Sequence, residues 1–263
     1  MSSRRITPDR AAAVCTRAVE AHATAGADWA DAVHHTARSL IDRLAVTRGL
    51  PAPGLARPAL PAAESALDTL GPLDGWEVGD LGEVHQLLLE LTPAVGKDGT
   101  VRATRPHQGR RDKQGAWYTP PEISAFMARA GLGLEIERLA AGGDPGAIFD
   151  LAVIDPACGA GVLMVESARF IAARLAVRVS GQDPPPETHV RAALPVVMTN
   201  CVYGVDIDPV AVDLARTALW LEAGGRPPFG FMDRNVIVGD VLAGPDENLP
   251  PAYRDRHPHL AAA

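Results

Sequence analysis

Three acidic residues in the second half of the sequence stand where each could meet a bound small molecule. Asp155 ends the apolar stretch Val153-Ile154-Asp155 and is followed by a turn that contains Gly159 and Gly161. Glycines let the backbone turn sharply and approach a ligand, and the free N–H groups at the start of the next helix can receive an anionic group. Ligands of open α/β sheets bind at the carboxyl ends of the strands. The stretch therefore predicts a small-molecule site that Asp155 faces.

The same arrangement occurs twice more along the chain. Asp206 ends the apolar run 202–205, and Asp240 follows the run 236–239. One glycine turn after a strand is weak evidence, because many turns need glycine only for a positive φ angle. Three successive strand ends that each carry an acid make the interpretation more specific. A helix or turn cap is the alternative role for Asp206 and Asp240, and we interpret Asp208 as such a cap.

Helical periodicity surrounds these predicted strands. Residues 162–179 and 211–221 repeat apolar side chains at steps of three and four, which predicts two crossover helices. Residues 181–187 are rich in proline and predict a loop, and residues 188–200 predict a helix interrupted at Pro195. The positions predicted to face the sheet are Met164, Ala168, Ile171, Leu175, Val179, Val212, Ala215, Leu219 and Trp220.

The first part of the chain, residues 1–115, predicts a helical region, and residues 116–263 a second domain. Helices are expected from Thr7, over 29–46 and over 81–91, with a Pro-rich linker over 51–61. Thr119 and Glu122 have the spacing of a capping box, with Pro120 at the first helical position. The helix that follows carries an apolar stripe of Ile123, Phe126, Met127, Ala130 and Leu134.

The segment 101–113 is locally basic and lacks apolar periodicity. A solvated loop and a segment that contacts a phosphate backbone both explain it, and the sequence does not separate the two. Its basic residues are Arg102, Arg105, His107, Arg110, Arg111 and Lys113.

Composition bounds the function further. The chain has 263 residues, 47% of them hydrophobic, and a net charge of −7, which argues against affinity of the whole chain for nucleic acid. Cys15, Cys158 and Cys201 lie far apart and form no C-x-x-C pair, so neither a disulfide framework nor a metal site is predicted. No apolar run reaches the roughly 18 residues that span a bilayer. We expect a cytoplasmic protein without a membrane partner.

The motifs taken together resemble the adenine-specific DNA methyltransferases of restriction-modification and phage-defence systems. The resemblance covers about the last two thirds of the chain and rests on the order of its motifs. It implies an α/β fold of the Rossmann-like, S-adenosylmethionine-dependent methyltransferase type, partial and limited to its first three strands. The motifs are Tyr118-Thr119-Pro120-Pro121-Glu122, Asp155-Pro156-Ala157-Cys158-Gly159-Ala160-Gly161, Val205-Asp206-Ile207-Asp208-Pro209 and Val238-Gly239-Asp240-Val241.

The resemblance also implies S-adenosylmethionine as cofactor and a role for each motif. The glycine turn would receive the methionine carboxylate, and Asp155 the amino group. Asp206 would accept hydrogen bonds from the ribose hydroxyls, and Asp240 one from the adenine amino group. Cys158 is expected to be a packing residue. The implied cofactor-binding residues are Tyr118, Thr119, Asp155, Ala157, Gly159, Gly161, Asp206, Ile207, Asp240 and Val241.

One motif of that family is not found in the sequence. Its catalytic tetrapeptide is Asn or Asp, two prolines and an aromatic residue, and neither 183–186 nor 226–229 fits it. We therefore predict a truncated or split enzyme without catalytic residues of its own, in which strand 151–155 keeps an unpaired edge. Double-stranded DNA and a second polypeptide that supplies the catalytic half are the expected partners.

Two alternatives to this enzyme stay open. One is a non-catalytic S-adenosylmethionine-binding subunit of a split methyltransferase, which shares every motif. The other is a nucleotide-dependent oxidoreductase. It is disfavoured because Asp206 follows Gly161 by roughly 45 residues, whereas the acid of a dinucleotide site follows its glycines by about 20.

Overall fold

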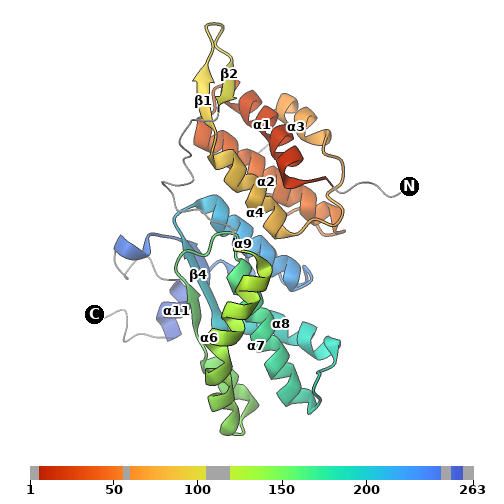
Figure 1. Cartoon of the computed structure of the whole chain (residues 1–263), viewed down its shortest axis with the longest axis vertical. Coiled ribbons are helices and arrows are strands. Elements are labelled where there is room, and N and C mark those ends of the chain that lie inside the picture. The colour runs from red at the N-terminus through yellow and green to blue at the C-terminus, as the bar shows by residue number, and fades with distance from the viewer. Residues whose placement is uncertain (1–5, 56–59, 105–118, 244–249, 257–263) are drawn as a thin grey trace. The chain divides into compact units, whose positions relative to one another are not determined.

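The contacts within the chain divide it into two units, Met1–Tyr118 and Thr119–Ala263 (Figure 1). The structure is a computed structural model and describes residues 6–55, 60–104, 119–243 and 250–256. In the described part, no helix is both long enough and apolar enough to cross a membrane.

The first unit is a small helical bundle with a hairpin. Helix α1 (Pro8–Thr24) packs on α2 (Trp29–Thr47), α3 (Pro61–Asp68) and α4 (Val78–Leu89). Proline at the first position of α1 needs no N–H partner, and the Asp28 carboxylate caps α2 by accepting the Ala30 N–H at 3.0 Å. The sequence predicted α2 and α4 but missed α3, whose eight residues begin where the expected linker ends.

The hairpin β1 (Thr92–Val95) and β2 (Val101–Thr104) corrects the expectation of an irregular segment. Its strands are mostly exposed, so they lack the apolar alternation by which strands are recognised. Side chains of α1 hold it instead: Glu20 accepts the Ala103 N–H at 2.8 Å and also pairs with Arg102. Of the basic segment 101–113, residues 105–113 lie outside the described residues, so contact with DNA stays a prediction.

The second unit is a mixed α/β arrangement around a parallel sheet. Strands β3 (Val153–Asp155), β4 (Val202–Asp206) and β5 (Val236–Val238) lie in the order β3-β4-β5. Parallel sheets are covered on both faces, and the middle strand β4 accordingly has four fully buried or nearly buried residues before Asp206. The three predicted strands are therefore confirmed and are neighbours in one sheet.

Helices cover this sheet as the apolar periodicity predicted. Helix α7 (Val162–Ser180) packs on β3 and β4, and α9 (Pro209–Glu222) packs on β4 and β5. Eight of the nine predicted sheet-facing positions are buried, and Val179, at the end of α7, is 62% exposed. The short elements η1 (Pro145–Asp150), η2 (Phe229–Met232), η3 (Val241–Ala243) and α11 (Pro251–Arg256) complete the described unit.

Helix α8 (Glu187–Cys201) contradicts the expected interruption, because it continues through Pro195. A proline inside a helix leaves the carbonyl four residues before it without its usual donor. That carbonyl belongs to Arg191, and it accepts a hydrogen bond from the Arg226 guanidinium at 3.3 Å. The long-range donor offsets part of the cost of the proline.

Helix α6 (Pro121–Ala141) starts one residue later than predicted. The Pro120 carbonyl accepts the first helical bonds, from the N–H groups of Ile123 and Ser124. Pro120 is thus the residue before the helix, and Pro121 takes the first helical position. Thr119 lies exposed and outside the helix, so the expected capping box with Glu122 is wrong by this one-residue shift.

Candidate functional site

The turn between β3 and α7 is fixed to the neighbouring strand β4. The Cys158 N–H donates to the Val205 carbonyl at 2.9 Å, and the turn closes on itself through the Gly161 N–H and the Cys158 carbonyl at 2.9 Å. Gly159 and Gly161 both have positive φ angles, +52° and +82°. A Cβ atom on Gly161 would lie 2.9 Å from the Cα of Ala215 in α9, so this position excludes larger residues.

Asp206 connects three parts of the site. Its Oδ2 atom accepts the Gly159 N–H at 2.8 Å, and its Oδ1 atom accepts the Asp208 N–H at 2.9 Å. Its main-chain carbonyl accepts the Gly239 N–H at 2.9 Å, which ties the end of β5 to the end of β4. A carboxylate can accept about four hydrogen bonds. The half-buried side chain therefore holds the turn and retains acceptor capacity for a ligand.

Asp155 lies at the end of β3 beside this turn. Its Oδ1 atom accepts the Ala157 N–H at 3.2 Å. Burial raises the pKa of Asp155, and the negative charge of Asp206 raises it further, although the Ala157 hydrogen bond opposes both effects. Two neighbouring carboxylates at a partly buried site favour a cationic ligand group, since a positive charge would relieve both the desolvation and the repulsion.

Asp240 follows β5 at the same edge of the sheet. Its Oδ1 atom accepts the Leu242 N–H at 3.0 Å, which is the cap role that the sequence left as the alternative. Asp208 caps α9 by accepting the Val210 N–H at 2.8 Å, as predicted. Two apolar side chains that follow the strand ends are exposed: Ile207, after β4, is 72% exposed, and Leu242, after β5, is 93% exposed.

The structure brings most of the predicted site residues to one edge of the sheet. Those at the ends of β3, β4 and β5 or in the first turn are Asp155, Ala157, Gly159, Gly161, Asp206, Ile207, Asp240 and Val241. Thr119 precedes α6, and no hydrogen bond in the described ranges ties it to the turn. Tyr118 lies outside the described residues, so its role stays a prediction.

Cys158 is a packing residue, as predicted from the sequence. Its side chain is 6% exposed, and burial raises the pKa of its thiol. It lies under the turn beside Gly204 of β4, where an added Cβ would come within 3.2 Å of the Cys158 Cβ and 2.7 Å of the Met164 sulfur. This use of Gly204 was not predicted from the sequence, although a glycine inside an apolar strand is a signal of close approach.

Asn235 is a second residue whose role was not predicted from the sequence. It is 3% exposed, and its Nδ2 group donates to the carbonyls of Thr199 and Val202, both at 3.0 Å. These bonds join the end of α8 to the start of β5. No local pattern announces this contact, because its partners lie more than 30 residues away in the sequence.

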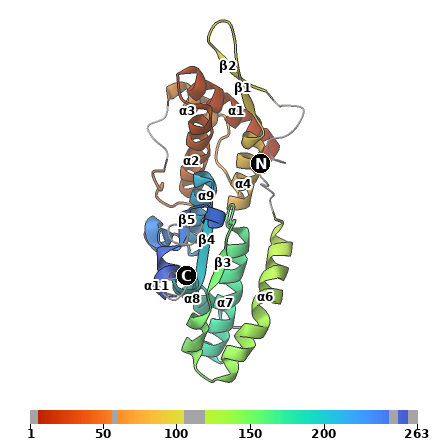
Figure 2. The same cartoon turned by 90° about the vertical axis from the view of Figure 1, so that its left-hand side faces the viewer.

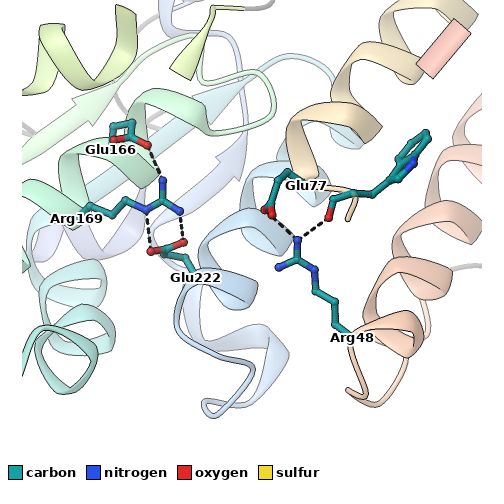
Figure 3. Close-up of polar contacts among 6 residues, drawn as sticks. Arg48, Glu77, Glu166, Arg169 and Glu222 are labelled. Carbon is teal, nitrogen blue, oxygen red and sulfur yellow. Dashed lines mark hydrogen bonds and ion pairs between the residues drawn. The ribbon is translucent and has the colours of Figure 1, made fainter. Parts of the chain in front are cut away.

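An ion-pair cluster ties the helix after the turn to α9. Arg169 of α7 donates to Glu222 through Nε at 2.8 Å and Nη2 at 2.5 Å, and to Glu166 at 2.6 Å (Figure 3). The hydrogen bonds to Glu222 raise the pKa of Arg169, first among several contributions from the two carboxylates. The other ion pair drawn in Figure 3 belongs to the first unit, where Arg48 pairs with Glu77 at 2.9 Å. The Arg169 cluster fixes the two helices whose first turns border the site.

The comparison with protein families found a match in this region. Residues 106–227 match the model of the N-6 DNA methylase family. The matched stretch contains Asp155, the glycine turn and Asp206, whereas Asp240 lies beyond it. Comparison with curated proteins gave no match, and neither did comparison with solved structures.

The match supports a relationship to the DNA adenine methyltransferases, and thus to enzymes that transfer methyl groups to DNA. N-6 DNA methylases generally use S-adenosylmethionine. The residues at the strand ends fit this cofactor in chemical type, because its amino acid part carries an ammonium and a carboxylate, and its nucleoside part carries hydroxyl and amino donors. Neighbouring carboxylates and free helix N–H groups are complementary to these groups.

Proposed function

We propose that this chain binds S-adenosylmethionine at the carboxyl ends of β3, β4 and β5. It would thereby form the cofactor-binding part of an adenine-specific DNA methyltransferase with a Rossmann-like sheet. The observation that carries the proposal is the position of Asp206 within the matched stretch. Its carboxylate lies at the end of β4, accepts a hydrogen bond from Gly159 of the turn and can accept further hydrogen bonds from a ligand.

Each part of the cofactor has a complementary group in this arrangement. The N–H groups at the start of α7 would receive the methionine carboxylate, and Asp155 the ammonium. Asp206 would accept from the ribose hydroxyls. Asp240 would accept a hydrogen bond from the adenine amino group, and the exposed side chain of Ile207 would lie against the ring. Val241 and Ala157 would border the cofactor.

The electrostatics of the free site also support a ligand with a positive charge. Asp155 has a raised pKa because it is buried near Asp206. An ammonium placed beside Asp155 would lower that pKa again and bind more tightly as pH rises through it. The proposal therefore includes a decrease in cofactor affinity at acidic pH.

The chemistry would be transfer of the methyl group from the sulfonium of the cofactor to the exocyclic amino group of adenine in double-stranded DNA. Such enzymes turn the target base out of the duplex and hold its amino group in line with the methyl group. We propose that this region forms the cofactor-binding part of the enzyme and that the residues that hold this amine lie outside it. A restriction-modification or phage-defence system is the proposed setting.

Isothermal titration with S-adenosylmethionine tests the cofactor site. We expect Asp206→Ala and Asp240→Ala each to weaken binding by about 1–3 kcal/mol, or roughly 5- to 150-fold, because each removes a charged acceptor from the ligand. The matched control is Asp150→Ala, an exposed acid that lies before β3, at the amino end of the strand. Unchanged affinity in both site variants would refute the proposal.

A further inference from the structure

Val179, which the sequence predicted to face the sheet, is exposed and lines a pocket instead. The pocket lies in the second unit between η1, the last turns of α7 and helix α8, and its volume is about 370 Å³. Figure 2 shows α7 and α8 side by side. Ligand pockets in proteins usually have volumes of about 300–1,000 Å³, so this pocket is large enough for a small molecule.

Small residues on the two facing helices leave the pocket open. Leu175, Ala176 and Val179 line it from α7. The lining residues of α8 have the i, i+3, i+4 and i+7 spacing of one helix face and are His189, Ala192, Ala193 and Val196. Protein interiors are close-packed, so facing helices normally fill the space between them with larger side chains. Here Ala176, Ala192 and Ala193 leave that space free.

The inner surface of the pocket is apolar. Its floor is formed by Leu175, Ala176 and Ala193, which are 7%, 1% and 9% exposed. Phe149 of η1 packs on the core of the unit and adds an aromatic ring to the lining. His189, at the exposed rim, is the polar side chain of the lining. A ligand would therefore be held mainly by burial of apolar surface.

The charges around the pocket are balanced. On the side of η1, Arg178 donates to the Asp144 carbonyl, and the Asp144 carboxylate accepts the Gly146 N–H at 2.7 Å. On the side of α8, Arg191 pairs with Glu187. Each side thus carries one positive and one negative residue, and neither sign predominates. Because a charged group in an apolar site without a partner is costly, an uncharged ligand fits this pocket best.

The apolar surface at the pocket is too narrow for a protein partner. In the described parts of η1, α7 and α8, the large apolar side chains with high exposure are Val179 and Val196. The exposed neighbours on the two helices include Arg174, Glu187 and Arg191. A stable protein–protein interface buries about 800 Å² on each partner around an apolar centre. The surroundings therefore favour a small molecule over a protein.

We propose that this pocket is a second ligand site of the chain and takes a small, uncharged, apolar molecule of the aromatic type. The inference does not rest on the proposed function. Leu175 follows Gly161 by 14 positions along α7, and a helix rises about 1.5 Å per residue, so the pocket lies about 20 Å from the glycine turn. The two ligands would therefore bind at separate places.

Fluorescence titration of the full chain with N-phenyl-1-naphthylamine tests the pocket. This probe is uncharged and aromatic, and its emission rises when it leaves water. We expect saturable binding of one probe per chain that S-adenosylmethionine does not displace. The probe 8-anilinonaphthalene-1-sulfonate has the same rings and a negative charge, and it should bind about threefold more weakly or worse. Absence of saturable binding, displacement by S-adenosylmethionine, or tighter binding of the charged probe would overturn the proposal.

Variants show whether the probe occupies this pocket. Ala192→Trp would fill it and Val179→Glu would place a charge in its wall, so each should weaken binding of the uncharged probe by about tenfold or more. Both residues are exposed, so both variants should fold, which urea titration checks. Ala130→Trp, at an exposed alanine of α6 outside the lining, is the control and should leave the affinity unchanged.

Three results with these variants would contradict the proposal. Wild-type affinity in both pocket variants would place the probe elsewhere. Equal weakening by Ala130→Trp would show that the probe binds to exposed apolar surface in general. A dimer of the wild-type chain that Ala192→Trp dissociates, seen by analytical ultracentrifugation, would make the pocket a contact between two copies.

Discussion

Replacement of Gly161 by alanine should destabilise the second unit more than the same replacement of Gly159. Both glycines have positive φ angles, so alanine costs roughly 1–2 kcal/mol at either position. At Gly161 the new Cβ would also lie 2.9 Å from the Cα and 3.0 Å from the Cβ of Ala215. A backbone atom cannot move aside as a flexible side chain can, and such overpacking costs roughly 1–3 kcal/mol more.

The expected loss in free energy of unfolding is therefore roughly 2–5 kcal/mol for Gly161→Ala and about 1–2 kcal/mol for Gly159→Ala. The effect of Gly159→Ala on S-adenosylmethionine affinity should be larger than its small effect on stability suggests. No atom lies within 4 Å of the Cβ position at Gly159, so its new methyl group would extend into the open space over the turn. If the cofactor occupies that space, Gly159→Ala should weaken S-adenosylmethionine binding about tenfold despite its small effect on folding.

Hydrogen exchange at increasing urea, read from peptides of β4, measures the stability of the second unit separately from the first. Isothermal titration measures cofactor affinity of the same proteins. Equal stability of the two variants would show that α9 does not press on Gly161. Unchanged affinity of Gly159→Ala would place the cofactor away from the turn.

Three further predictions concern the surroundings of the site. Asp155→Asn should raise the free energy of unfolding at pH 7, because burial raises the pKa of this acid and its charge therefore destabilises the folded state. The gain in stability should vanish below about pH 4, where the acid is protonated in both the folded and the unfolded state. Urea titrations at the two pH values measure both effects. Arg169→Met should lower stability by about 1 kcal/mol, less in high salt, because the ion pairs are half-exposed; melts at low and high salt measure this. Asn235→Ala should cost roughly 2–3 kcal/mol in a urea titration, because the buried carbonyl of Val202 and the partly buried carbonyl of Thr199 lose their donor.

Each of these predictions has a contrary outcome. An Asp155→Asn protein that is less stable than wild type at pH 7 would mean that the carboxylate is stabilised by its surroundings. A salt-independent loss in Arg169→Met would assign the effect to packing of the side chain. An Asn235→Ala protein of wild-type stability would mean that water replaces the amide.

Local features of the sequence were enough to predict the elements that form the site. Glycines after an apolar stretch, acids at strand ends and apolar steps of three and four depend only on residues near one another in the chain. For this reason β3, α7, β4, α9 and β5 were predicted in order, and Asp155 and Asp206 were expected at one edge of a sheet.

Contacts between distant residues were decided by the tertiary structure. Asp206 reaches back 47 positions to hold the N–H of Gly159, and Glu20 holds the hairpin from 83 positions away. Pro195 is tolerated inside α8 because Arg226, 35 positions from Arg191, donates to the carbonyl that the proline leaves free. Local periodicity carries no record of such partners, since a hydrogen bond depends on which groups the fold brings within about 3 Å.

The exposed apolar stripe of helix α6 shows the same division between local and tertiary information. The sequence correctly marked Ile123, Phe126, Met127, Ala130 and Leu134 as one apolar stripe, because a helical period is a local property. Which of two apolar faces packs on α7 depends on the surfaces that the other helices present. In the folded unit, the face that carries Ala128 and Ile136 is buried, and the predicted stripe is exposed.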